Sequence, residues 1–279
     1  MLIPVLLACV VSWYLLKAVG RRVPRVGRLV DRAVPWTRRL HAWVLSAPAT
    51  FGYIAVFTCF TLVQTTSPPR LVDVLTRVNS TSLFELRRDA LDVLATSAFW
   101  VADRGSGLAL YAVAFATVVA WAERRYGTPR LILIALSGHV LGSLITEGLL
   151  QNQINTGRAS EKLIYSTDVG VSYMLVASVA AAVLVMRGRV RLVAAACVLA
   201  ALVTPMISDR TIWDLGHVIA AACGLAVAAL SLLAGPLREP QPLRDPRVPS
   251  GPGGPGVTGG PGVPREGGVQ DVQEGRDRA

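Results

Sequence analysis

The sequence has little charge for its length. Only 16% of its 279 residues are Asp, Glu, Lys or Arg, whereas a soluble globular chain carries about 25%. Hydrophobic residues make up 52% and the mean hydropathy is +0.49. This composition argues against a water-soluble enzyme and predicts a protein of the lipid bilayer. The net charge of +10 then indicates arginines on the cytoplasmic side of a membrane rather than a nucleic-acid partner.

The chain also lacks paired cysteines and clustered histidines. All four cysteines lie within apolar runs and show no short paired spacing, which excludes a disulfide framework and a zinc site. No two of the three histidines share a predicted helix at ligand spacing. We therefore expect neither a metal nor another cofactor.

Long runs without any charged residue dominate what remains. Spanning the hydrocarbon core takes about 17–25 apolar helical residues. The runs are continuous in Leu, Ala and Val rather than alternating, so we expect helices, and the fold class is an all-α polytopic membrane protein. The seven runs are 1–16, 42–69, 105–122, 131–146, 169–186, 192–208 and 215–237.

The distribution of basic residues predicts the orientation. If the Arg-rich stretch from Lys17 to Arg39 is cytoplasmic and each later run crosses once, 20 Lys and Arg lie inside and 8 outside, which accounts for all 28. The C-terminal tail is then cytoplasmic too. Run 1–16 lacks the basic start of a secretory signal, and we interpret it as an extra helix with its N-terminus outside. The alternative is a helix that only skims the membrane.

These features divide the chain into four parts. Residues 1–19 hold the possible extra transmembrane helix, and residues 20–45 form an Arg-rich cytoplasmic segment. A six-helix membrane domain follows over 46–235, with interfacial amphipathic helices expected in its outer loop 70–104. Residues 236–279 contain 10 Gly and 9 Pro and are expected to be disordered.

Few ionisable groups fall within the predicted spans, where they are costly and by default mark function. Ser172 and His217 lie near the outer starts of the fifth and seventh runs, each about one turn below an aspartate, Asp168 or Asp214. Both aspartates could instead cap their helices. His139 falls in the fourth run, and Glu147 is expected at the interface at its outer end.

This arrangement allows nucleophilic chemistry. A serine hydroxyl is inert alone, but a neutral imidazole within hydrogen-bond reach can take its proton. Ser172 and His217 are therefore the candidate nucleophile and base. The negative charge of a tetrahedral intermediate needs donors, for which His139 and the backbone N–H of Ser172 are candidates.

At these residues the sequence resembles the rhomboid intramembrane serine proteases, and more closely a divergent rhomboid-like branch. The resemblance covers about residues 46–235 and implies a six-helix core with Ser172 and His217 as catalytic residues. Small residues at Ala220 and Gly224 would let the last helix pack against the nucleophile helix. The matching segments are Glu123-Arg124-Arg125-Tyr126-Gly127, Gly170-Val171-Ser172 and His217-Val218-Ile219-Ala220-Ala221-Ala222-Cys223-Gly224.

The sequence also departs from the family pattern. Tyr173 replaces the second glycine of the nucleophile motif, and counting back from Glu123 puts the family's oxyanion-supporting His and Asn near Gly107 and Tyr111, so both are absent. The resemblance thus leaves two functions open. One is an intramembrane serine protease that cleaves transmembrane substrates near the outer face, with supporting roles for His139, Asp168, Gly170, Tyr173 and Asp214. The other is a catalytically inactive protein that binds the transmembrane helices of client proteins.

Overall fold

A computed structural model of the chain describes residues 2–101, 106–208 and 211–239. These residues form helices and no strand, which confirms the all-α prediction. The predicted tail over 236–279 falls almost entirely outside the described residues.

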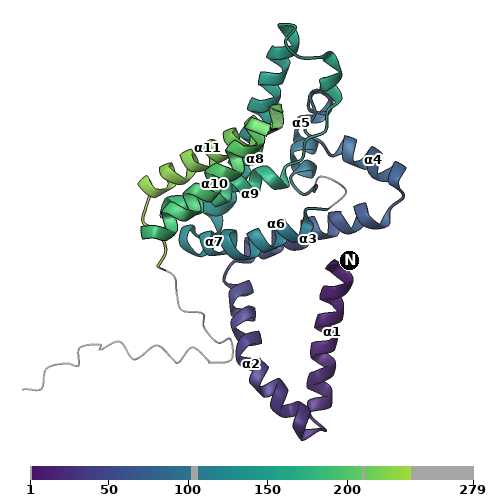
Figure 1. Cartoon of the computed structure of the whole chain (residues 1–279), viewed down its shortest axis with the longest axis vertical. Helices are drawn as coiled ribbons and strands as arrows, with labels where there is room; N and C mark the ends of the chain where they lie inside the picture. Colours follow the sequence, from purple (N-terminus) through teal and green to yellow (C-terminus); the bar gives the residue numbers. More distant parts are fainter. Residues whose placement is uncertain (1, 102–105, 209–210, 240–279) are drawn as a thin grey trace, which may run out of the picture. The chain divides into compact units, whose positions relative to one another are not determined.

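Two helices precede the membrane domain. α1 (Leu2–Gly20) and α2 (Pro24–Leu45) meet at the turn that joins them and diverge from there (Figure 1). A Cβ on Gly20 would lie 3.2 Å from the Cα of Gly27, so the absence of side chains allows the close approach. The C-terminal end of α2 is fixed to the later chain by Trp43, whose indole N–H donates to the carbonyl of Ala116 at 2.8 Å.

The six later apolar runs are confirmed as helices. α3, α8, α10 and α11 are each long and apolar enough to cross a membrane, and α9 is a shorter apolar helix. The second core helix is continuous in space but changes its winding, because the π-helix η2 separates α6 from α7. The elements are α3 (Pro48–Thr66), α6 (Leu108–Ala114), η2 (Phe115–Val119), α7 (Ala120–Tyr126), α8 (Thr128–Asn155), α9 (Val171–Val185), α10 (Gly188–Ser208) and α11 (Ile212–Leu233).

The junction between α7 and α8 holds the start of α3. The buried carboxylate of Glu123 accepts hydrogen bonds from the backbone N–H groups of Ala49 and Thr50, at 3.0 and 2.8 Å, and from the hydroxyls of Thr50 and Thr128. It thus satisfies orphan donors at the N-terminus of α3. Gly127, with φ of +85°, reverses the chain after α7. This is the physical reason for a glutamate and a glycine in the Glu-Arg-Arg-x-Gly segment.

Helices α8, α9 and α11 pack most extensively against one another (Figure 1). Small residues line their contacts. Gly142 of α8 lies against Ala220 of α11, while Gly138 of α8 and Gly224 of α11 both approach Ala177 of α9. Backbones this close gain van der Waals contact that larger side chains would prevent. Ala220 and Gly224 thus occupy helix contacts.

The loop 70–104 and the loop before α9 fix the point where α9 begins. The loop 70–104 contains α4 (Pro69–Val78) and α5 (Leu83–Ser97), which confirms helices there, and the 3-10 helix η3 (Glu161–Tyr165) precedes α9. The backbone of Asp168 is bound on both sides: its N–H donates to Ser80 Oγ at 2.6 Å and its carbonyl accepts from Thr81 N–H at 3.0 Å. Gly170 N–H donates to the Ser97 carbonyl at 2.9 Å. The residues that lead into α9 are therefore held by three hydrogen bonds.

Candidate active site

Ser172 and His217 lie together in the structure. Ser172 is the second residue of α9, and His217 is in the second turn of α11. His217 Nε2 is 3.0 Å from Ser172 Oγ. At this distance a neutral imidazole nitrogen can accept the serine proton. Ser172 Oγ also lies 3.4 Å from the carbonyl of Val169, a longer contact.

The imidazole of His217 is held from two further directions. It interacts with the backbone carbonyl of Trp213, one turn earlier in α11. If Nδ1 of His217 carries the proton and donates it to that carbonyl, Nε2 is left free to accept from Ser172. The ring of Tyr173 meets the imidazole edge to face, with centroids 5.0 Å apart and planes at 86°.

Tyr173 interlocks with the residue before His217. A Cβ on Gly216 would lie 1.9 Å from the Tyr173 hydroxyl and 2.9 Å from Thr146 Oγ1. Only glycine at 216 leaves room for this tyrosine. The contact between Tyr173 and Gly216 therefore lies directly beside the contact between Ser172 and His217, so Tyr173, which replaces a glycine of the family pattern, fills the space between α9 and α11.

Two buried carboxyl groups lie behind Tyr173. Asp168 and Glu147 are both buried, their charges interact with the Tyr173 hydroxyl, and Asp168 Oδ2 and both oxygens of Glu147 have no hydrogen-bond partner among the described residues. Burial raises the pKa of the Asp168 carboxyl from 3.8 to about 6. Glu147, which we expected at the membrane interface, is covered by protein, and its depth in the membrane stays a prediction.

The two aspartates do not play equivalent parts. Asp214 and Thr211 form a capping box at the start of α11, with Thr211 N–H donating to Asp214 Oδ2 at 2.9 Å. The capping role considered for Asp168 is wrong, because α9 has Gly170 as its N-cap and no side-chain cap. Asp168 Oδ1 accepts instead from the adjacent Val169 N–H at 2.9 Å.

His139 packs beneath the loop that leads into α9. Its Nε2 lies 2.9 Å from the carbonyl of Leu94 and 3.4 Å from Ser97 Oγ. Because a carbonyl only accepts, Nε2 carries the proton and donates to Leu94. A Cβ on Gly170 would lie 2.2 Å from the imidazole, so the ring fills the space that this glycine leaves open. The structure places His139 against α5 and Gly170 and does not bring it into contact with Ser172.

An apolar cavity of about 520 Å³ opens beside Ser172 and His217. α6, α9, α10 and α11 contribute its walls, and among the described residues its polar lining side chains are those of Tyr111, Ser172, Asp214 and His217. α10 has no buried residue in the described chain and is the least enclosed of these walls. The volume of this cavity matches that of sites for small molecules or short peptide segments.

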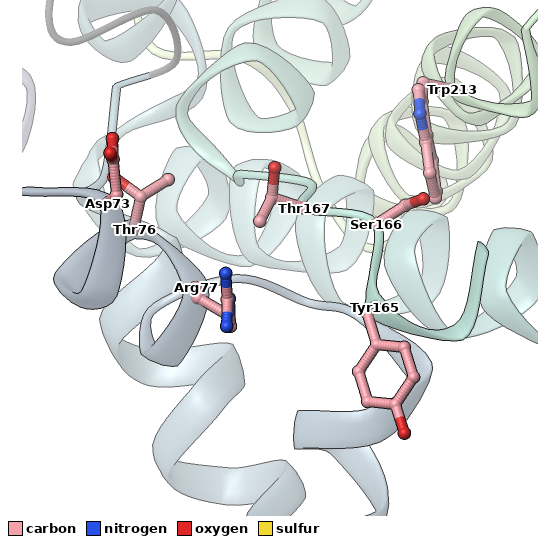
Figure 2. Close-up of a pocket in the computed structure, with 7 residues that line it drawn as sticks. All are labelled: Asp73, Thr76, Arg77, Tyr165, Ser166, Thr167 and Trp213. Atoms are coloured by element: carbon pink, nitrogen blue, oxygen red, sulfur yellow. The ribbon is translucent and has the colours of Figure 1, made fainter. Parts of the chain in front are cut away.

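A second hollow of about 590 Å³ lies among α4, the loop before α9 and the start of α11, and it is polar (Figure 2). The Arg77 side chain of α4 lies there below Thr167 in the view, and Ser166 lies beside Trp213 (Figure 2). Trp213 comes one turn before His217, and Thr167 five residues before Ser172. The loops that line this hollow therefore lead directly into the two helices that carry Ser172 and His217.

The fold and this geometry define a multi-pass helical membrane protein with a serine–histidine pair beside an apolar cavity. The family model of rhomboid-like proteins matches residues 42–235, so the chain belongs to the rhomboid-like protein family. No curated protein and no solved structure matches the chain.

Sequence reasoning passed over several residues that shape this site. Gly216 was not singled out, although its position beside His217 and the adjacent bulky Tyr173 carried a signal. Ser97 and Thr146 belong to no recognisable sequence motif. Tyr111 was noted only as the loss of a family asparagine, yet it lines the cavity.

Proposed function

We propose that this protein is an intramembrane serine protease of rhomboid type, with Ser172 as nucleophile and His217 as general base. The supporting observation is the 3.0 Å separation of Ser172 Oγ and His217 Nε2 at the wall of an apolar cavity in a membrane protein. A peptide carbonyl in that cavity would meet an activated hydroxyl away from bulk water.

The reaction would follow ordinary acyl transfer. Ser172 Oγ attacks the carbonyl carbon while its proton passes to His217 Nε2, and the carbonyl electron pair moves onto oxygen. Collapse of this intermediate breaks the C–N bond, and the His217 proton goes to the leaving amine. Water, deprotonated by His217, then releases the acyl group from Ser172.

The expected substrates are the transmembrane segments of single-span membrane proteins. The cavity lining is almost wholly apolar, which suits a segment that comes from the bilayer. The polar hollow around Arg77 would take the part of the substrate outside the membrane. With the Arg-rich segment and the tail in the cytoplasm, cleavage would take place near the outer face.

A fluorophosphonate probe tests this proposal. Purified protein in detergent should be labelled, and Ser172→Ala should abolish labelling while the thermal unfolding midpoint stays near that of the wild type. A folded wild-type protein that resists labelling would contradict the proposal.

A second function is favoured by one feature of the sequence: Gly107 and Tyr111, at the N-cap and within α6, stand near the positions where the resemblance places the family's oxyanion-supporting His and Asn. A protein without catalysis would bind the transmembrane helices of clients in the same cavity. Client capture in a detergent pull-down would then be the same for Ser172→Ala as for the wild type, and no cleavage product would form with either.

A further inference from the structure

Helix α2 carries four of its five arginines in one exposed row. Arg25, Arg28, Arg32 and Arg39 follow one another at spacings of 3, 4 and 7 residues, which places them on the same face of the helix. The side chains of Arg25, Arg28 and Arg32 make no hydrogen bond or ion pair with the described residues. α2 therefore presents a line of positive charge about 21 Å long.

A row of large apolar side chains runs directly beside these arginines. Leu29, Trp36 and Leu40 are 63, 70 and 62% exposed. Helical spacing places them about 20–60° from Arg25 around the axis of α2. The two rows touch, because the Arg39 guanidinium lies over the Trp36 ring at 5.3 Å from its centroid. Together they form one exposed surface, here called the α2 surface, which consists of Arg25, Arg28, Arg32, Arg39, Leu29, Trp36 and Leu40.

Both ends of α2 are connected to apolar helices by short links. Residues 46–47 join it to α3, which is long and apolar enough to cross a membrane, and residues 21–23 join it to the apolar α1. α2 itself is not one of the candidate spans in the described chain, since five arginines and an aspartate interrupt its 22 residues. A helix that is kept close to the bilayer and exposes arginines beside tryptophan and leucine suits the boundary between lipid headgroups and acyl chains.

We propose that the α2 surface binds anionic phospholipids, with its arginines against the phosphates and its apolar row among the acyl chains. A guanidinium presents planar donors that match phosphate oxygens, and each arginine near an anionic membrane surface contributes about fivefold in affinity. A nucleic acid would pair with the arginines but would leave Leu29 and Leu40 in water. The binding of lipid by α2 does not depend on any reaction at Ser172.

Lipids with brominated acyl chains test this proposal, because bromine quenches the fluorescence of a tryptophan that it touches. The full chain is reconstituted in phosphatidylcholine nanodiscs that contain increasing fractions of brominated phosphatidylglycerol or, in a parallel series, of brominated phosphatidylcholine. The contribution of Trp36 is the difference between the wild type and Trp36→Phe. Half-maximal quenching of Trp36 should need a fraction of phosphatidylglycerol about fivefold lower than that of phosphatidylcholine, the contribution of one arginine beside the bound headgroup.

Three arginines nearest to Trp36 provide the decisive variants. Arg28→Gln, Arg32→Gln and Arg39→Gln, combined in one chain, should make the two brominated lipids quench Trp36 at equal fractions. The same three positions changed to lysine keep the charge and should keep the preference for phosphatidylglycerol. All three side chains are exposed, so the thermal unfolding midpoints of both variants should stay near that of the wild type.

The matched control removes three exposed arginines at the start of α10, outside α2. Arg187→Gln, Arg189→Gln and Arg191→Gln lower the net charge by the same amount and should leave the preference at Trp36 unchanged. Equal quenching by the two lipids in the folded wild type, or a preference that survives the triple glutamine change in α2, would overturn the proposal. A Trp36 that neither lipid quenches but that responds to single-stranded RNA would overturn it in favour of a nucleic acid. Ser172→Ala should retain the preference, so failure here leaves the proposed function intact.

Discussion

Gly224→Ala should separate the two helices that carry Ser172 and His217. A Cβ at this position would lie 2.7 Å from Ala177 Cα and 2.8 Å from the Ala177 carbonyl oxygen, whereas ordinary contacts begin at 3.4 Å. Both atoms belong to the backbone of α9 and cannot rotate away. α11 must therefore move from α9, and a shift of 0.7 Å, the difference between 3.4 and 2.7 Å, would restore an ordinary contact with Ala177 Cα.

This displacement has two measurable consequences. Overpacking of this kind lowers the free energy of unfolding by about 1–3 kcal/mol. His217 lies seven residues, or about two turns, before Gly224 on the same helix. A misplacement near 1 Å can lower a rate by about 10²-fold, so labelling of Ser172 should slow as well.

The assay compares thermal unfolding midpoints and labelling rates with those of Gly148→Ala. Gly148 lies on the exposed side of α8, and a methyl group added there would have no atom within 4 Å. Removing this helical glycine should leave stability unchanged or raise it by about 0.5–1 kcal/mol. If Gly224→Ala unfolds at the wild-type midpoint and labels at the wild-type rate, the tight contact of α9 with α11 does not set the geometry of the pair.

Two further predictions concern buried carboxyl groups. Glu123→Ala leaves two backbone N–H groups and two threonine hydroxyls without their acceptor and should lower the free energy of unfolding by about 2–4 kcal/mol, while the exposed Glu161→Ala should change it by less than about 0.5 kcal/mol; equal unfolding midpoints for the two variants would contradict the role of Glu123. Because burial raises the pKa of Asp168 from 3.8 to about 6, the folded state binds this proton more tightly than the unfolded state. Stability should therefore fall by up to about 3 kcal/mol as the pH rises from about 4 to 7. Asp168→Asn should have the flatter profile of unfolding midpoint against pH, and parallel profiles would refute this reasoning.

The sequence predicted the membrane helices well because runs of apolar residues report contact with lipid. It was less successful where protein, rather than lipid, surrounds a helix. α8 continues to Asn155, beyond the predicted run 131–146, and Glu147, the first charged residue after that run, is buried in protein. The Arg-rich segment is helical in α2, although no apolar run marks it, because its hydrophobic residues are spaced around one face.

The contact between Ser172 and His217 was predicted from chain order and depth, and the structure places the two atoms at hydrogen-bond distance. The roles of the other site residues depend on where their side chains point, which the spacing of residues in the sequence does not give. Asp168 was expected to act one turn above Ser172, but backbone hydrogen bonds to Ser80 and Thr81 hold it in the loop before α9. The position of His139 likewise follows from α5, whose kink at Asp89 no local motif announces.

The π-helix between α6 and α7 determines which side chains the cavity receives. Residues 115–119 wind more slowly than a regular helix, since their hydrogen bonds join residues five apart. α6, on the N-terminal side of this segment, is therefore turned about the helix axis relative to Glu123. Deletion of one residue, such as Thr117, would restore regular winding and rotate α6 by about 100°. A single extra residue in the second core helix thus determines which residues of α6 line the cavity, which in this chain are Leu110 and Tyr111.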